Sequence, residues 1–276
     1  MLNFARTAAL VGMFAGLASP ALAADMMEPP VEPVPVTPVY QEAGFGGWYI
    51  RGDVGYHQSK WRGADYITYG PPAGSNSFTS GKLRGALSLG GGVGYQVTRH
   101  FRTDLTGDYR FKSKFEAPTA GTCGSGGYCT SNDSSRFSAL LLLANAYADL
   151  GTWNGVTPYV GAGIGGAHVK WDTLVNEDGD GHFEHSGAKG WRFAYALMAG
   201  ASYCLTDRAK LDVGYRFTHI DGGRMFEYAN GGGPGFDKGF NNHEVRAGLR
   251  YQFGNSDCAP PQEVAAQSQP EPHYTK

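Results

Sequence analysis

Apolar and polar side chains alternate with a period of two over much of this chain, and no other feature constrains the fold as strongly. Phe101 and Leu105, for example, alternate with Arg102 and Asp104. Successive side chains of a β-strand point to opposite faces, so this pattern indicates a strand with one apolar and one charged face. The pattern predicts strands in eight segments: 47–57, 82–97, 101–112, 137–150, 158–172, 191–203, 210–218 and 244–253.

Two of these segments are less regular than the others. In 137–150 a run of leucines hides the alternation until Asn145, Tyr147 and Asp149 emerge on one face. The segment 158–172 is so rich in glycine that its faces are left unassigned, although its length and bounding turns still indicate a strand.

The length and charge of the segments decide which face points outward. They exceed the usual strand of about five or six residues and reach the roughly 9 to 11 residues that cross a hydrocarbon layer at a tilt. A soluble barrel would bury the apolar face, but a lipid-facing one would place it outside and keep the charges within. Aromatic residues near the strand ends are typical of a membrane-interface girdle: Trp48, Tyr56, Phe101, Phe111, Trp171, Trp191, Tyr203, Tyr251 and Phe253.

The connections alternate in length, as expected when strands run up and down. Long connections are predicted at 60–81, 116–135, 174–188 and 222–241, and short turns near Thr98, at 151–157 and at Thr206. Short turns face the periplasm in outer-membrane barrels, and an even number of strands leaves both termini on that side. The sequence therefore predicts an all-β, eight-stranded antiparallel up-and-down transmembrane β-barrel.

Composition divides the chain into four parts. Residues 1–23 have a basic residue, a short apolar stretch and a small-residue cleavage site, which are the features of a signal peptide. We expect a Pro-rich periplasmic linker at 24–46, the barrel at 47–253 and a Pro- and Gln-rich periplasmic tail at 254–276. No apolar run is long enough for a transmembrane helix. The net charge of −2 does not favour a nucleic-acid partner.

The sequence resembles small outer-membrane barrels of the OmpA-like and opacity-protein type, especially the alphaproteobacterial surface-antigen branch. The resemblance rests on GWYIRGDVGY (47–56), LANAYADLG (143–151), TPYVGAGIGGAHV (157–169) and EVRAGLRYQF (244–253). It implies a role in envelope integrity and surface interaction, with outer-membrane lipids, lipopolysaccharide and a host or surface ligand as partners. It also implies an insertion signal for the barrel-assembly machinery at Gly248, Tyr251 and Phe253. That signal usually ends the chain, whereas here the tail follows it.

An eight-stranded barrel has an interior that side chains can fill. We expect a salt-bridged lumen, with a narrow path for ions or small solutes as the alternative. The candidates for this polar network are Arg51, Asp53, Arg84, Arg102, Asp104, Asp108, Arg110, Asp212, Arg216, Glu244, Arg246 and Arg250.

The four cysteines suggest disulfides, because an exported chain meets an oxidising compartment. Cys123 and Cys129 bracket a Gly-rich segment and would close a small ring within one connection. Cys204 and Cys258 then either pair with each other, pinning the tail to the barrel rim, or remain free.

Other chemistry is weakly indicated. Asn176, Asp178 and Asp180 resemble the first half of a calcium-binding EF-hand loop, but Gly187 replaces the glutamate that would complete it. His57 with Ser59, and His185 with Ser186, invite comparison with lipid- or peptide-modifying enzymes, although neither pair has an evident orienting carboxylate. Scattered histidines could bind haem or metal at the surface: His168, His182, His185, His219 and His243. We expect no enzyme activity and no cofactor.

Overall fold

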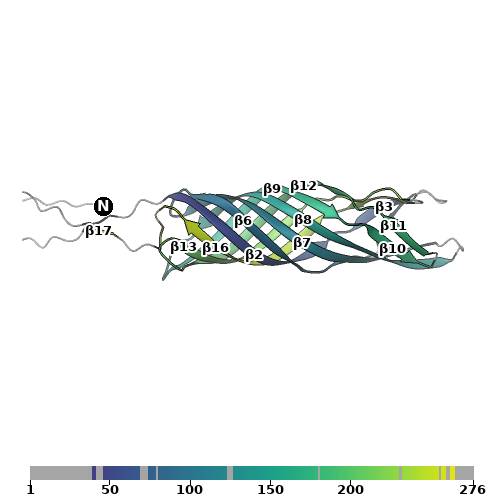
Figure 1. Ribbon diagram of the computed structural model, residues 1–276, viewed down its shortest axis with the longest axis horizontal. Coiled ribbons are helices and arrows are strands. Elements are labelled where there is room, and N and C mark those ends of the chain that lie inside the picture. The colour runs from purple at the N-terminus through teal and green to yellow at the C-terminus, as the bar shows by residue number, and fades with distance from the viewer. Residues whose placement is uncertain are drawn as a thin grey trace, which may run out of the picture. The chain divides into compact units, whose positions relative to one another are not determined.

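The computed structural model forms a closed antiparallel β-barrel (Figure 1). It describes residues 39–41, 46–68, 74–78, 80–122, 127–179, 181–229, 232–254, 256–258 and 262–264. Each barrel strand pairs with two neighbours, and the last strand, β16, pairs with the first, β2, so the sheet closes on itself. The wall follows the order β2 (Gly47–Trp61), β6 (Ala86–Gln96), β7 (Phe101–Thr122), β8 (Tyr128–Asp149), β9 (Val156–Trp171), β12 (Lys189–Cys204), β13 (Ala209–Ile220) and β16 (Phe240–Gln252).

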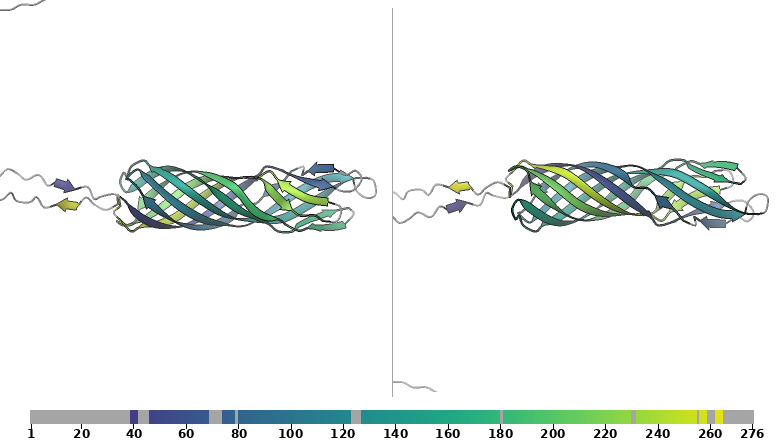
Figure 2. Two further views of the ribbon diagram at one scale, coloured as in Figure 1. Left: turned by 90° about the horizontal axis from the view of Figure 1, so that it is seen from above. Right: turned by 90° about the horizontal axis from the view of Figure 1, so that it is seen from below.

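The predicted fold class is confirmed. Each of the eight segments contains one strand of the wall, and neighbours in sequence are neighbours in the barrel. The segment 82–97 is interrupted after Leu83, and its wall strand begins only at Ala86. The strands slant across the barrel axis (Figures 1 and 2), as closure of a sheet requires. Among the described residues no helix is long and apolar enough to cross a membrane.

The two ends of the barrel differ. One end, here called the turn end, has short connections at 97–100, 150–155 and 205–208. The other, the loop end, extends well beyond the wall because β7 and β8 continue as a long hairpin (Figure 2). It carries further strands: β3 (Ala64–Thr68), β4 (Gly74–Ser77), β5 (Lys82–Leu83), β10 (Leu174–Asp178), β11 (Gly181–His185), β14 (Gly223–Phe226) and β15 (Gly232–Asp237).

Except for β5, these added strands lie in the segments predicted as long connections. Strands β14, β15, β3 and β4 form a four-stranded sheet, while β10 pairs with both β8 and β11. The loop end is therefore built largely of hydrogen-bonded β-structure, and its backbone groups are satisfied by sheet pairing.

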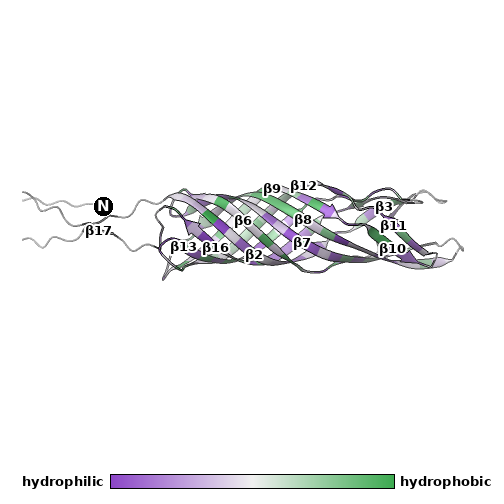
Figure 3. Ribbon diagram, in the orientation of Figure 1, coloured by the Kyte–Doolittle hydropathy of each residue, from purple (hydrophilic) through white to green (hydrophobic). Residues whose placement is uncertain are grey.

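The two-residue alternation continues along the barrel wall (Figure 3), but it changes phase at two places. A bulge in β7 between Arg110 and Ser113 leaves Phe111 and Lys112 both exposed, and beyond it Phe115 points into the barrel. A bulge adds one residue to one strand, so the faces exchange beyond it. The break between β5 and β6 has the same effect.

Two predictions about individual side chains are wrong, and a change of phase explains the first of them. Arg84 lies in the break between β5 and β6, and its side chain is 68% exposed rather than part of the lumen. Trp171, predicted for the interface girdle, is 2% exposed because the alternation of β9 turns it inward.

A separate pair of short strands, β1 (Val39–Gln41) and β17 (Gln262–Val264), forms a two-stranded sheet. The predicted signal peptide (1–23) and most of the predicted linker and tail lie outside the described residues. The boundaries of these parts therefore stay predictions.

Candidate functional site

The outer wall of the barrel is apolar. Exposed aliphatic side chains cover its middle, and exposed aromatic rings lie toward both edges, with Trp48, Phe101 and Tyr251 near the turn end and Tyr56 and Trp191 toward the loop end. In contrast, the buried side chains of the same strands are largely charged or polar. A soluble protein buries its apolar side chains and exposes its charged ones, whereas this wall does the opposite, as expected for a barrel surrounded by hydrocarbon.

Eleven of the twelve predicted lumen residues point into the barrel, Arg84 being the exception. All eleven are buried: Arg51, Asp53, Arg102, Asp104, Asp108, Arg110, Asp212, Arg216, Glu244, Arg246 and Arg250.

The centre of the lumen is bridged by Arg216 on β13. Its Nη1 lies 2.7 Å from Asp108 Oδ2 on β7, and its Nη2 lies 2.8 Å from Glu244 Oε2 on β16. Strands β13 and β7 are four steps apart in either direction around the wall, so the ion pair spans the full width of the barrel. Arg110 completes the group, since its Nη2 donates to Thr218 Oγ1 at 3.0 Å.

A second group of ion pairs adjoins the first. Arg51 forms a two-point contact with Asp53 and reaches Asp104 Oδ2 at 3.2 Å. Arg246 Nη2 lies 2.8 Å from Asp53 and 3.4 Å from Asp108, which links the two groups. Because removing one member would leave a buried partner without its counter-charge, the network is mutually dependent.

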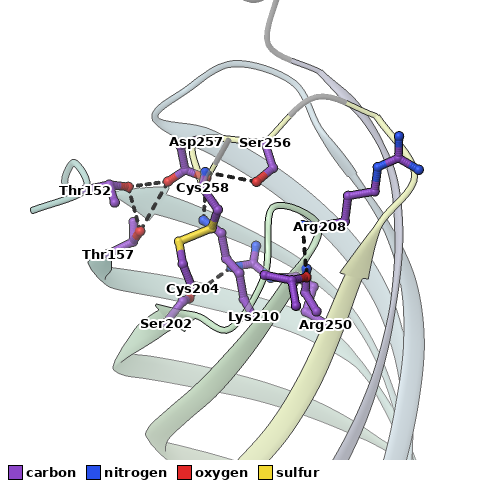
Figure 4. The surroundings of a disulfide bond; sticks show 12 residues. Thr152, Thr157, Ser202, Cys204, Arg208, Lys210, Arg250, Ser256, Asp257 and Cys258 are labelled. Atoms are coloured by element: carbon purple, nitrogen blue, oxygen red, sulfur yellow. Dashed lines mark hydrogen bonds and ion pairs between the residues drawn. A yellow bond between two sulfur atoms is a disulfide. The ribbon is translucent and has the colours of Figure 1, made fainter. Parts of the chain in front are cut away.

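The start of the tail lies at the turn end (Figure 4). Cys204 at the end of β12 and Cys258 form a disulfide. Asp257, the preceding residue, accepts hydrogen bonds from Lys210, Thr152 and Thr157. Burial alone would raise the pKa of Asp257, but the Lys210 ammonium and its hydrogen bonds outweigh that effect and hold the pKa below its usual value. Cys129 is also disulfide-bonded, and its expected partner Cys123 lies outside the described residues.

The loop-end side of the lumen is filled by aromatic rings. Phe137 on β8 stacks on Phe240 of β16 with ring centroids 4.7 Å apart. These two strands also lie opposite one another in the wall, so the stack closes the interior. We call the continuous set of rings around it the aromatic cluster: Trp61, Phe78, Phe115, Phe137, Trp171, Phe226 and Phe240.

Buried polar contacts hold the added strands of the loop end. Arg192 Nη1 lies 2.7 Å from Asp237 Oδ1, and Trp171 Nε1 donates to Asp237 Oδ2 at 3.1 Å, which ties β15 to β12 and β9. Asn176 Nδ2 donates to Asp133 Oδ1 at 2.5 Å and ties β10 to β8. Burial raises the pKa of both carboxyl groups, Asp133 and Asp237.

The structure places the suggested catalytic residues in a closed environment. Ser59 Oγ lies 3.4 Å from His57 Nδ1, yet both side chains are buried inside the barrel, and the Ser59 hydroxyl donates to Asn242. His185 is half-buried against the Phe226 ring, and Ser186 is exposed.

The suggested calcium ligands lie in the hairpin of β10 and β11. Asn176 directs its amide group to Asp133, Asp178 accepts the backbone N–H of Gly181, and Asp180 lies outside the described residues. Across the described part of the chain, no three His, Cys, Asp or Glu side chains form a group that could hold a metal ion.

A closed antiparallel barrel with an apolar outer wall and an ion-paired interior defines an integral outer-membrane β-barrel. The chain belongs to the outer membrane protein beta-barrel domain family, whose model matches residues 9–253. Its location is therefore the outer membrane.

Among its relatives is an uncharacterized protein of Brucella abortus, 37% identical over 90% of this chain and 99% of that protein. A Rickettsia bellii protein named as a candidate adhesin is 26% identical over 77% of this chain and 90% of its own length. Neisserial surface protein A is a solved structure with 18% identity and a TM-score of 0.41, covering 75% of this chain and 97% of the other.

Several important residues were not singled out in the sequence. Arg192, Asp237, Asp257 and the aromatic cluster apart from Trp171 lie in or beside segments predicted as connections or tail. A buried aromatic beyond a change of strand phase has the same sequence signature as an exposed one, so no local signal identifies these residues.

Proposed function

We propose that this protein is a non-conducting, non-enzymatic barrel that contributes to envelope integrity and presents its loop end for contact with the cell's surroundings. In this orientation the turn end faces the periplasm, which is the usual place for short connections. Strand β2 begins and β16 ends at the turn end, with Tyr49 paired to Gln252. Both chain termini would then be periplasmic.

The observation that carries the proposal is contact between opposite walls of the barrel. The Arg216–Asp108 ion pair and the Phe137–Phe240 stack each span the lumen, and they lie at different depths. An ion path would have to pass both. This arrangement favours an anchor over the alternative of a narrow channel.

The lack of room for a substrate beside His57 and Ser59 argues against the enzyme alternative. His57 and Ser59 are buried within the barrel. Just beyond them along β2, Trp61 pairs with Phe240 of β16, whose ring is also buried. A nucleophile and base need room for a substrate within hydrogen-bond reach, which a filled lumen does not offer.

Surface contact is the finer part of the proposal. The loop end exposes polar and aromatic side chains on or beside its hydrogen-bonded strands, among them Tyr128, Phe183 and Tyr228. Aromatic residues on a rigid scaffold make effective contacts because little conformational entropy is lost on binding. The name of the Rickettsia bellii relative points in the same direction.

Conductance tests the proposal that the barrel is a non-conducting anchor, and adhesion tests the proposal that its loop end makes surface contacts. The refolded barrel in a planar bilayer is expected to give no resolved conductance steps, and regular steps would reject the anchor. Cells that carry a variant with 175–184 replaced by a two-residue Asn-Gly turn should adhere less to host-cell or matrix-coated surfaces than wild-type cells. A heat-shifted gel band must show that this variant barrel still folds. Equal adhesion by wild-type cells and by cells that lack the barrel would reject the contact role.

The insertion signal predicted at Gly248, Tyr251 and Phe253 also stays a proposal. Tyr251 on the last strand and Phe253 just after it are exposed, so an assembly factor could reach them during insertion. Gly248 has a further reason to be glycine, because a Cβ there would lie 2.2 Å from Asp53 Oδ1. Loss of membrane-inserted protein in a Phe253→Ala strain, with normal export, would be the expected result.

A further inference from the structure

A recess of about 790 Å³ opens on the barrel where two strands fail to pair. Strand β2 pairs with β6 only as far as His57 and Ala86, while β5 pairs with β7. The last part of β2, 58–61, and the segment 81–85 therefore face each other without a described ladder, and both line the recess.

Two glycines and two rings fix the shape of this recess. A Cβ on Gly85 would lie 2.1 Å from the Tyr56 hydroxyl oxygen, and a Cβ on Gly81 would lie 2.3 Å from Cε3 of Trp61. The rings thus pack directly on the backbone of 81–85, so a larger residue at either position would displace them. The recess is bounded by rigid groups rather than by flexible side chains alone.

The recess carries an excess of positive charge. Lys60, Lys82 and Arg84 line it together with a single acidic side chain, Glu116. The shortest contact of Glu116 is to Lys114 at 2.7 Å, whereas Arg84 Nη2 is 3.5 Å away. No carboxylate of the described residues lies within 4.0 Å of the ammonium groups of Lys60 and Lys82. Cations gathered without counter-charges favour an anionic ligand.

The recess adjoins the lipid-facing wall. Tyr56, which lines it, is 57% exposed and pairs across the strands with Leu87, which is 63% exposed. Along β2, Lys60 follows Tyr56 on the same face by only two outward positions, with Gln58 between them. The cations therefore lie just beyond the apolar band, at the depth of lipid headgroups.

The neighbouring sector of the wall differs. Along β13 and β16 the outward positions at this end are held by His219, Asn241 and His243, with Asn241 paired directly to Lys60 of β2. The wall next to Lys60 on this side therefore has no lysine or arginine at these outward positions, whereas exposed Arg136, Lys170 and Lys189 lie farther round the barrel on β8, β9 and β12.

We propose that this recess binds the phosphate-bearing sugar headgroup of a glycolipid in the leaflet at the loop end. Lys60, Lys82 and Arg84 contact the phosphate oxygens, and Gln58 offers an amide to a sugar hydroxyl. The acyl chains lie along the exposed side chains of Tyr56 and Leu87, which distinguishes a membrane-anchored ligand from a soluble anion. Placing that leaflet on the cell surface rests on the orientation proposed above.

Binding of bis-phosphorylated lipid A and its dephosphorylated form to the full-length barrel in mixed detergent micelles tests the site. The wild type is expected to prefer the phosphorylated lipid. A variant with Lys60→Gln, Lys82→Gln and Arg84→Gln should bind it on the order of 100-fold more weakly, since each cation near an anionic headgroup contributes measurably. A heat-shifted gel band verifies that each variant is folded.

The matched control removes the same charge elsewhere on the outer wall, with Arg136→Gln, Lys170→Gln and Lys189→Gln. These exposed residues lie on β8, β9 and β12, away from the recess. The control should keep its preference for phosphate. An equal loss in the control, no preference in the wild type, or equal affinity for inorganic phosphate or a soluble sulfated polysaccharide would overturn the proposal.

The micelle assay is independent of orientation, so it separates this site from the function proposed above. Labelling of Glu184→Cys on intact cells with a membrane-impermeant thiol reagent tests which end is outside. If labelling fails while the lipid preference holds, the proposed function is wrong and the site stands. If labelling succeeds and the lipid preference is absent, the glycolipid site is wrong and the proposed orientation stands.

Discussion

Arg216 and Asp108 belong to opposite strands of the barrel, yet their side chains meet at 2.7 Å within it. Glu244 shares the same guanidinium at 2.8 Å. Replacing Arg216 with Met should lower the free energy of unfolding by about 3–5 kcal/mol, because two buried carboxylates lose their shortest ion-pair contacts. Urea unfolding of the barrel in lipid vesicles, followed by tryptophan fluorescence, measures this change.

An exposed ion pair provides the control for that experiment. Arg224 and Glu227 lie 2.7 Å apart with both side chains 41% exposed. Arg224→Met should change the free energy of unfolding by only about 0–1 kcal/mol, because solvent screens the pair. Similar losses of unfolding free energy in the two variants would mean that the lumen is solvated and that the Arg216 ion pairs stabilise the barrel no more than an exposed pair does.

The stack of Phe137 on Phe240 gives a second prediction. Each side chain is fully buried, so Phe137→Ala and Phe240→Ala should each cost about 3–5 kcal/mol. Their combined loss should be smaller than the sum by roughly 0.5–1.5 kcal/mol, since each ring loses its partner only once. Phe193→Ala on the exposed outer wall is the matched control, and strict additivity of the two buried changes would contradict the stacking.

The barrel wall could be predicted because its information is local. In β7, Arg102, Asp104 and Asp108 alternate with apolar neighbours, and the inside–outside choice follows from charge and length alone. The same rule fails where the phase changes. The prediction for Arg84 is wrong because the break between β5 and β6 exchanges the faces, and no sequence signal marks such a break or the bulge at Arg110–Ser113. The prediction for Trp171 is wrong because the glycines of β9 hide which of its faces is inward.

The interior contacts are not local, and this limits what the sequence reveals about the site. Phe137 and Phe240 stack only because closure brings β8 opposite β16. The cationic recess likewise depends on a missing ladder between β2 and β5, although Lys60, Lys82 and Arg84 are unremarkable as sequence. Strand order can be inferred from alternation, whereas the pairing register that creates such sites cannot.

The buried pair of Arg192 and Asp237 predicts a local effect at the loop end. Asp237 also accepts hydrogen bonds from Trp171 and from the backbone N–H of Gly239. Asp237→Ala should leave Arg192 unpaired and release β15, so that protease cleavage within 223–237 becomes faster while the barrel keeps its heat-shifted band. Asp237→Asn retains hydrogen-bonding groups and should give an intermediate rate; cleavage unchanged in both variants would argue against this role.

The Cys204–Cys258 disulfide predicts a redox-dependent tail. The two residues are separated by 54 positions, and such a cross-link restrains the unfolded chain by up to roughly 4 kcal/mol. Intact-mass analysis should show no alkylation at either thiol before reduction. After reduction, or in a Cys204→Ser, Cys258→Ser variant, protease cleavage after 254 should accelerate, and labelling without reductant would refute the bond.

His185 predicts a pH dependence at the loop end. Its ring lies 5.0 Å from that of Phe226, its Nδ1 has no hydrogen-bond partner within the described structure, and burial lowers its pKa from the ordinary 6.5. The unfolded segment therefore binds a proton more readily than the folded one. The contact is at full strength above pH 6.5 and weakens as the pH falls below that value toward the lowered pKa. Cleavage of the β10–β11 hairpin should thus accelerate between pH 7.5 and 5.5, after correction by a short peptide cleaved at each pH. His185→Phe keeps the aromatic contact but has no titrating group, so its corrected rate should be the same at both values. A wild-type rate that is independent of pH, or a variant that retains the dependence, would assign the effect to another group.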